Sequence, residues 1–250
     1  MNFNKPLISI ITVSYNVVNT IEQTILSIIN QNFDNYEYII IDGGSQDGTL
    51  DIIKKYEDKI NFWVSEPDKG IYDAMNKGIL AANGEWVSFM NAGDRFAIKD
   101  INLLEKSFNN KNIDVIYGDM LMEKNQTLSL IKASPLLQLN YSMNFCHQSC
   151  FVRTHLLKNM PFSLNYKISA DYDFFLKIFI KGSNFYYENC AISVFEYGGI
   201  SSGISKKYLV ERLSIIYDNH TTLKNKLTFT YKFLKMLVPF NRKTLSFFSK

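Results

Sequence analysis

The first half of the chain alternates short, continuously apolar segments with segments that carry a helical pattern. The apolar segments are LISIITVSY (7–15), YEYIIID (36–42), NFWVS (61–65) and EWVSFMN (85–91). They are rich in β-branched residues and too short to be helices of their own. Strands that stay apolar along their length are buried on both faces, which is typical of a mostly parallel sheet between two layers of helices. The sequence therefore predicts an α/β fold.

Helical signals follow most of these strands. Asn19 and Glu22 have the spacing of a capping box, which predicts a helix that begins there and runs to about Asn30. Further helices are expected over 49–56, 71–82 and 170–181. The second half is more mixed, with a strand expected at 114–120 and hairpin segments around Leu128 and Phe151.

Length and cysteine content limit the class of protein. A chain of 250 residues with 46% apolar residues is long enough for one large domain with an appendage. Its three cysteines do not form a disulfide framework, so we expect reduced thiols and a cytoplasmic location. The segment CHQSC (146–150) does not predict a zinc site, because the only other cysteine is Cys190.

Charge divides the chain into an acidic body and a basic tail. The last 45 residues contain ten Lys and Arg against two acidic residues, whereas the net charge of the whole chain is only +3. We therefore expect a domain over 1–205 and a basic helical tail over 206–250. The acidic body argues against a nucleic-acid partner.

The tail has two alternative interpretations. Within 224–250, apolar residues recur at helical spacing among lysines, namely Phe229, Phe233, Met236 and Leu237. Such a helix could lie on an anionic membrane, at the inner face of the plasma membrane, or it could pack its apolar stripe on the body.

Polar residues follow the apolar strands, at the edge where ligands of parallel sheets bind. Asp42 is followed by two glycines, which allow a close approach of the backbone to a ligand. Its carboxylate could accept a hydrogen bond from a nucleotide base or ribose, or it could only organise a turn. The segment SEPDKGIYDAMNKG (65–78) adds lysines and carboxylates that suit a phosphorylated ligand, or a solvated loop. The glycine motifs of dinucleotide-binding and P-loop proteins are absent.

Five segments, taken in order, resemble the motifs of family 2 glycosyltransferases with the GT-A fold. They are ITVSYN (11–16), IIIDGGSQDGT (39–49), EPDKGIYDAMNKG (66–78), FMNAGD (89–94) and SADYDFFLKI (169–178). The resemblance spans about residues 6–202 and is closest to the bacterial branch that serves exopolysaccharide, capsule or lipopolysaccharide synthesis. It implies an inverting transfer of a sugar from a UDP- or GDP-sugar to a hydroxyl of a glycan or lipid-linked acceptor.

The resemblance also implies roles for individual residues. Asp94 closes the motif that holds Mn²⁺ or Mg²⁺, Asp171 is the general base, and Asp42 contacts the nucleotide base. The other residues that it places at the nucleotide-sugar are Thr12, Tyr15, Asn16, Lys69, Asn76 and Asn91. It places His147 and Gln148 on the acceptor side.

The chain departs from the family pattern at three places in the site. Many members carry a second aspartate at the position of Gly43, have Asp-x-Asp-Asp where this chain has Asn91-Ala92-Gly93-Asp94, and often have a glutamate at the position of Ala170. A hard divalent ion can take one protein carboxylate together with phosphate oxygens and water, so Asp94 alone is sufficient if the metal arrives with its diphosphate. The missing carboxylates leave a nucleotide-sugar binding module without turnover as one alternative function. A nucleotidyltransferase that also uses carboxylate-held metal is another.

Overall fold

The structure, a computed structural model, describes residues 5–196 and 205–245, with side chains as far as Leu237. Its strands are β1 (Ile8–Ser14), β2 (Tyr36–Asp42), β3 (Phe62–Ser65), β4 (Trp86–Phe89), β5 (Arg95–Phe96), β6 (Val115–Lys124), β7 (Thr127–Ile131), β8 (Cys150–Arg153) and β9 (Phe185–Glu196). Its helices are α1 (Ile21–Ile29), α2 (Thr49–Lys55), α3 (Ile71–Ala81), α4 (Glu105–Asn109), α5 (Thr154–Asn159), α6 (Ala170–Ile180), α7 (Lys206–Asn219) and α8 (Leu223–Leu245). Short 3-10 turns precede β8 and α4.

All the strands join one sheet in the order β3-β2-β1-β4-β8-β6-β9-β5, and β7 extends β6 as a hairpin. The first four strands are parallel, as the sequence predicts. β8 then lies antiparallel to both β4 and β6, and β5 lies antiparallel to β9. β6 and β9 are parallel to each other and run in the same direction as the first four strands, so the sheet is mostly parallel, as predicted, and β5, β7 and β8 run in the opposite direction.

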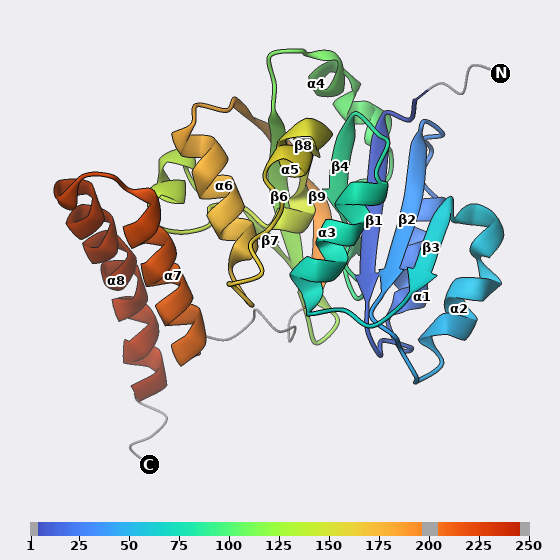
Figure 1. The fold of residues 1–250 in the computed structure, drawn as a ribbon, viewed down its shortest axis with the longest axis horizontal. Coiled ribbons are helices and arrows are strands. Elements are labelled where there is room, and N and C mark those ends of the chain that lie inside the picture. The colour runs from blue at the N-terminus through green and yellow to red at the C-terminus, as the bar shows by residue number, and fades with distance from the viewer. Residues whose placement is uncertain (1–4, 197–204, 246–250) are drawn as a thin grey trace.

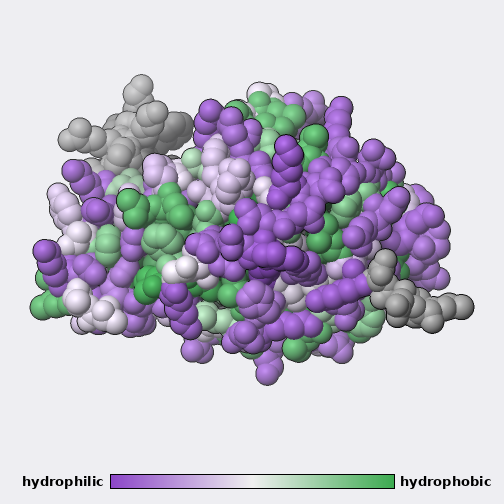
Figure 2. Space-filling view, turned by 90° about the horizontal axis from the view of Figure 1, so that it is seen from above, coloured by the Kyte–Doolittle hydropathy of each residue, from purple (hydrophilic) through white to green (hydrophobic). Residues whose placement is uncertain are grey.

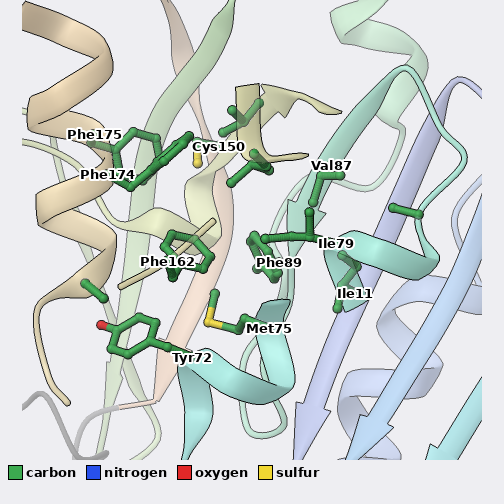
Figure 3. Close-up of a cluster of buried hydrophobic side chains, with 14 of the residues drawn as sticks. Ile11, Tyr72, Met75, Ile79, Val87, Phe89, Cys150, Phe162, Phe174 and Phe175 are labelled. Carbon is green, nitrogen blue, oxygen red and sulfur yellow. The ribbon is translucent and has the colours of Figure 1, made fainter. Parts of the chain in front are cut away.

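Helices cover both faces of this sheet (Figure 1). Alternate residues of β1 point to opposite faces, so Ile8 and Ile10 pack towards α1, α2 and α4, whereas Ile11 and Val13 pack towards α3, α5 and α6. Figure 3 shows the second of these cores. Burial on both faces explains why the parallel strands are continuously apolar.

The register of the parallel strands places the last residues of β1, β2 and β3 side by side. All three of these residues are polar. Asp42 lies opposite Ser14 of β1 and opposite Ser65 of β3. The arrowheads of these strands point to the same edge of the sheet in Figure 1. The loops after β1, β2, β3 and β4 therefore meet at one edge, as expected.

The capping box predicted at Asn19 and Glu22 is wrong. α1 begins after Thr20 without a side-chain cap. The Glu22 carboxylate instead accepts hydrogen bonds from Lys55 Nζ at 2.6 Å and from Tyr56 Oη at 2.7 Å, which ties α1 to α2. The side chain of Glu22, which the local pattern assigned to capping the helix start, is thus used for a tertiary contact instead.

The tail forms a pair of helices, α7 and α8, that pack beside α6 (Figure 1). Phe233 of α8 is fully buried with Tyr172 and Leu176 of α6, and Phe229 and Leu237 pack against the same cluster. The apolar stripe of the tail is thus used to pack on the body, which is one of the two alternatives for it. Among the described residues, none of the helices combines the length and the apolar character needed to cross a bilayer.

Most of the surface seen in Figure 2 is hydrophilic, with separate hydrophobic patches. Several of the exposed apolar side chains belong to the other side of α8, namely Leu223, Leu227, Tyr231 and Leu234. Their spacing of four, four and three residues places them on one face of the helix.

The packing of α8 on the body can be tested with a matched pair of substitutions. Phe233→Ala should lower the free energy of unfolding by about 3–5 kcal/mol, because it removes a fully buried aromatic ring and leaves a cavity. Leu227→Ala, on the exposed face of the same helix, should change it by no more than about 0.5 kcal/mol. Urea unfolding of both variants measures the difference. Equal, small effects would mean that α8 does not pack on the body in solution.

Candidate active site

The carboxylate of Asp42 organises the row of strand ends. It is fully buried and accepts hydrogen bonds from the hydroxyls of Ser14 (2.8 Å), Ser45 (2.6 Å) and Ser65 (2.7 Å), and from the backbone N–H groups of Gly44 and Ser45. Burial acts to raise the pKa of Asp42, but these hydrogen bonds outweigh it and hold the pKa below its ordinary value. Asp42 is therefore ionised and fully occupied by its own loops, which gives it the role of holding the β1, β2 and β3 loops together.

The groups beside Asp42 that solvent can reach are those of Tyr15, which is exposed, and Asp68, which is half-buried. The Tyr15 ring is 62% exposed. Both side chains lie against Gly43, where a Cβ would come within 2.5 Å of Asp68 Oδ2 and 3.3 Å of the Tyr15 ring. A residue other than glycine would therefore push this loop apart. Asp68 is one of the carboxylates of the segment 65–78, for which the sequence left open a phosphorylated ligand or a solvated loop.

Asn16 and Lys69 also belong to this edge. Asn16 adopts a left-handed backbone conformation and ties its loop to the next one, accepting from Gln46 N and donating its own N–H to Ser45 Oγ. Lys69 is exposed in the loop before α3. The structure thus brings Tyr15, Asn16 and Lys69 to the edge near Asp42, as the resemblance implies.

Two of the residues predicted to bind the nucleotide-sugar lie outside this group. Thr12 is fully buried in the middle of β1, where its hydroxyl donates to Met90 O and meets Tyr38 Oη. The amide of Asn76 both donates to and accepts from the backbone of Phe162, at 2.9 Å in each case. The hydrogen-bonding groups of both side chains are used to hold the fold.

The turn that carries Asp94 follows β4 and is fastened from two sides. Ala92 N donates to Val13 O of β1, and Thr24 of α1 donates its hydroxyl to Asp94 O while accepting from Gly93 N. Gly93 has a φ of 105°, a conformation that a residue with a Cβ rarely adopts. The turn is therefore rigid and holds Asp94 at the sheet edge.

Asp94 is a buried carboxylate with too few hydrogen-bond donors. Gln148 Nε2 donates to its Oδ2 at 2.7 Å, and the backbone N–H of Glu196, at the end of β9, also donates to it, whereas the Glu196 carboxylate repels it. Burial, the largest effect, raises the pKa of Asp94 to about 6, despite the opposing effects of His147 and Gln148. The resemblance did not point to Glu196 as a neighbour of Asp94, because it lies 102 residues further along the chain.

Beside Asp94, a second oxygen is available to a cation. Asn91 Oδ1 is buried and has no hydrogen-bond partner among the described residues. Within the same part of the chain, no three His, Cys, Asp or Glu side chains gather as a metal site. A hard cation prefers oxygen ligands, so Asp94 and Asn91 fit Mn²⁺ or Mg²⁺ when a ligand such as a diphosphate supplies the remaining oxygens.

A line of polar contacts joins the Asp94 turn to Asp171 at the start of α6. Asn91 Nδ2 lies 3.3 Å from His147 Nε2, and His147 Nδ1 lies 3.3 Å from Asp171 Oδ2. If Asn91 donates to Nε2, the imidazole carries its proton on Nδ1 and donates it to Asp171. The four residues predicted for the metal side, the acceptor side and the base, namely Asn91, Asp94, His147 and Asp171, are thus brought together.

Asp171 is buried and ionised. The hydroxyl of Tyr72, on α3, donates to its Oδ1 at 2.9 Å, and Figure 3 shows Tyr72 at the margin of the core. Burial acts to raise the pKa of Asp171, but His147, the charge of Arg212 and Tyr72 lower it to about 2. The carboxylate is therefore available as a proton acceptor at neutral pH.

Asp173, two residues further along α6, has a different role. It is buried, and its carboxylate binds Lys177 Nζ at 2.6 Å and accepts from Asn219 of α7 at 3.0 Å. Both partners are structural, so Asp173 stabilises the contact between α6 and α7.

The loop before α6 is held by the tail. Glu211 of α7 is buried and accepts the backbone N–H groups of Lys167, Ile168 and Ser169 at 2.8–3.0 Å. These are the residues that lead into Asp171. Sequence analysis missed Glu211, because its partners lie more than 40 residues away and no local pattern connects them.

Comparisons with known proteins agree with this geometry. Residues 9–163 match the model of the family described as glycosyl transferase family 2. The chain is 32% identical over 216 residues to a PGL/p-HBAD biosynthesis glycosyltransferase of Mycobacterium bovis, covering 83% of this chain and 84% of the relative.

Two solved structures share the fold. One is Staphylococcus aureus TarS 1-349 in complex with UDP, with a TM-score of 0.72 at 22% identity, covering 94% of this chain and 73% of that one. The other is the mannosyltransferase PcManGT of Pyrobaculum calidifontis in complex with GDP-Man and Mn²⁺, with a TM-score of 0.63 at 14% identity, covering 95% and 76%. The chain therefore belongs to glycosyl transferase family 2 and has the GT-A fold of these enzymes.

Proposed function

We propose that the protein transfers a sugar, with inversion, from a nucleotide-diphosphate sugar to an acceptor hydroxyl at Asp171. The observation that carries this proposal is the contact line from Asn91 through His147 to Asp171, which joins a cation-type turn to a buried, ionised carboxylate. The structural neighbours support the donor class, since one was solved with UDP, another with UDP-GlcNAc and a third with GDP-Man and Mn²⁺. Their low identity leaves the choice between UDP and GDP to experiment.

On the donor side, Tyr15 offers an exposed ring for stacking, and Asp68 and Asn16 offer polar atoms for a base or ribose. Asp42 acts by fixing the loops that carry these groups, since its carboxylate is already occupied by five hydrogen bonds. Asp94 and the free oxygen of Asn91 would hold Mn²⁺ or Mg²⁺. Such a metal would neutralise charge on the leaving diphosphate as a Lewis acid.

On the acceptor side, Asp171 takes the proton of the attacking hydroxyl. The hydroxyl oxygen forms a bond to the anomeric carbon as the bond to the diphosphate breaks, and a single displacement from the opposite side inverts that centre. His147 and Tyr72 hold the carboxylate in place through its two oxygens. The acceptor would be a glycan or lipid-linked glycan of cell-surface polysaccharide synthesis, the class implied by the sequence motifs.

Two other functions make different chemical predictions. A binding module without turnover would bind a nucleoside diphosphate and never hydrolyse or transfer the sugar. A nucleotidyltransferase would release free diphosphate rather than a nucleoside diphosphate. Product analysis with two substrate sets, a UDP- or GDP-sugar and a nucleoside triphosphate with a sugar 1-phosphate, therefore distinguishes all three, and release of nucleoside diphosphate from the nucleotide-sugar is the outcome that we expect.

We also propose that α8 contacts an anionic membrane through the face that does not pack on the body. Lys224, Lys226, Lys232 and Lys235 lie along the same helix, although Lys226 and Lys232 lie over the rings of Tyr217 and Tyr141, and their positive charge suits an anionic surface. The lipid-linked acceptor class would give such a contact a purpose.

The membrane contact can be tested by co-sedimentation with vesicles. The wild-type protein should bind phosphatidylglycerol vesicles at low salt and not phosphatidylcholine vesicles, because the lysines are attracted to anionic lipid. The double variant Leu227→Gln, Leu234→Gln should lose this binding and keep its melting temperature, since both side chains are exposed. A wild-type protein that ignores anionic vesicles, or a variant that loses a dimer instead, would contradict a membrane role.

The role of Asp171 can be tested with Asp171→Asn. Transfer should fall about 10²–10⁴-fold, because the amide cannot accept the proton, while nucleoside diphosphate affinity should stay within about twofold. Asp173→Asn is the matched control, and it should lower the melting temperature and retain near-normal transfer. Activity assays, calorimetry and thermal unfolding of the two variants measure these effects. Near-normal transfer by a folded Asp171→Asn protein would move the base elsewhere.

The role of Asp94 predicts a dependence of stability on pH. Because folding raises its pKa from 3.8 to about 6, the protonated form is favoured, and the benefit present below pH 4 is lost as the pH rises through 6. In the presence of EDTA, Asp94→Asn should therefore be about 2–3 kcal/mol more stable than the wild type at pH 7.5 and equally stable at pH 4. Urea unfolding at both pH values measures this difference.

The same variant tests the metal. Asp94→Asn should lose the gain in nucleoside diphosphate affinity that Mn²⁺ provides, while affinity in EDTA should be unchanged. Gln148→Ala is a control that removes the donor to Asp94 and keeps the carboxylate. A variant that retains the full effect of Mn²⁺ would exclude Asp94 as a ligand.

A further inference from the structure

A pocket of about 310 Å³ opens beside Asp171. Segments 131–134 and 143–148 line it, together with side chains from β6 and β9. Asp171 and His147 form part of its wall, whereas Asp42, Asp68 and Asp94 do not. The pocket therefore lies on the acceptor side of the proposed reaction.

Arg212 of α7 contributes the one charged group of the wall that is both cationic and buried among the described residues. It is only 7% exposed, and its guanidinium lies 4.2 Å from the Tyr172 ring centroid and 5.0 Å from that of Tyr208. Its Nε and Nη1 atoms are buried and have no hydrogen-bond partner among the described residues. The charge of Arg212 lowers the pKa of Asp171, but no hydrogen bond joins the two side chains within this part of the chain.

Arg153 shows how the same fold treats a buried arginine that has only a structural role. It is 6% exposed, stacks on Trp86 at 3.9 Å, and binds the carbonyls of Ile113 and Asn110 and the carboxylate of Glu85. Each of its nitrogens thus has an acceptor. Arg212 resembles it in burial and stacking and differs in lacking the acceptors, although an unpaired buried charge is costly.

A second unused polar atom faces the same pocket. Asn144 is 4% exposed, and its amide nitrogen donates to Ser134 O, but Oδ1 has no partner among the described residues. This oxygen can accept a hydrogen bond from a sugar hydroxyl. Lys132, which is exposed, adds a positive charge at the pocket wall. The unpaired guanidinium of Arg212 and the unpaired amide oxygen of Asn144 therefore suit a ligand that carries an oxyanion next to a hydroxyl group.

We propose that this pocket binds an anionic substituent of the acceptor, a phosphate or a carboxylate, through the guanidinium of Arg212. The proposal rests on the proposed function, since it places this anion next to the hydroxyl that Asp171 deprotonates. The planar guanidinium can donate two parallel hydrogen bonds to either kind of oxyanion. Arg212 then acts as a specificity residue that selects acidic glycans, and Asn144 accepts from a neighbouring hydroxyl.

The test is an NMR titration of the full chain in the presence of UDP and Mg²⁺, which is diamagnetic and does not broaden the signals near the site. The probes are inorganic phosphate, glucuronate and glucose, and the signal is the Nε–H resonance of Arg212, assigned by its loss in Arg212→Lys. Phosphate or glucuronate should shift this resonance, and glucose should not. The anion that binds with the higher affinity, phosphate or glucuronate, identifies whether the substituent of the acceptor is a phosphate or a carboxylate.

Substitutions complete the test. Arg212→Gln should weaken binding of the preferred anion about 10–100-fold and leave UDP affinity within twofold. Lys207→Gln, which removes the same charge from an exposed position on α7, should leave both affinities unchanged. The proposal is overturned if neither anion shifts the resonance, if glucose shifts it equally, or if Arg212→Gln weakens UDP instead. The wild-type titration decides even if Arg212→Gln does not fold. A failure of UDP binding would count against the proposed function and leave the anion titration valid.

Discussion

The cost of burying carboxylates governs the arrangement of this active site. Asp42, Asp94 and Asp171 lie at one edge of the sheet, and each is at most 8% exposed. A buried charge is tolerated only when donors or opposite charges replace the lost water. Three loops and a helix start are therefore bent towards these carboxylates, and their positions follow from where the donors can be supplied.

The three carboxylates are compensated to different degrees, and this difference separates their roles. Asp42 has enough hydrogen-bond donors to stay ionised and has no oxygen left for a ligand. Its role is therefore to hold the surrounding loops together. Asp171 is also ionised, yet it faces a pocket where a substrate can reach it. Asp94 has too few donors, so it is the carboxylate that benefits most from an added cation. Arg212 is likewise a buried charged group with too few hydrogen-bond partners among the described residues, but it is positive, so it would benefit from an added anion.

Sequence patterns predicted those parts of the site that depend on local rules. Each apolar strand ends at a polar residue, so the convergence of the loops around Asp42 and Asp94 could be inferred from strand ends alone. The burial of Thr12 could not be predicted in this way. The motif includes this residue, but its place in the middle of β1 buries its side chain. Glu211 and Arg212 could not be found either, since their roles depend on how α7 packs against α6, a contact between distant segments.

Glu211 and Arg212 are neighbours on α7. Their adjacency links the conformation of the loop before α6 to the chemistry of the pocket beside Asp171, two properties that could otherwise evolve separately. One residue fixes the loop that leads to Asp171, and the other lines the pocket beside Asp171. The segment that looks like an appendage by charge thus packs on the body and contacts the proposed site. A recombination event that joined residues 1–205 of one such enzyme to the α7 of another would carry acceptor preference with the exchanged helix and leave the donor loops untouched.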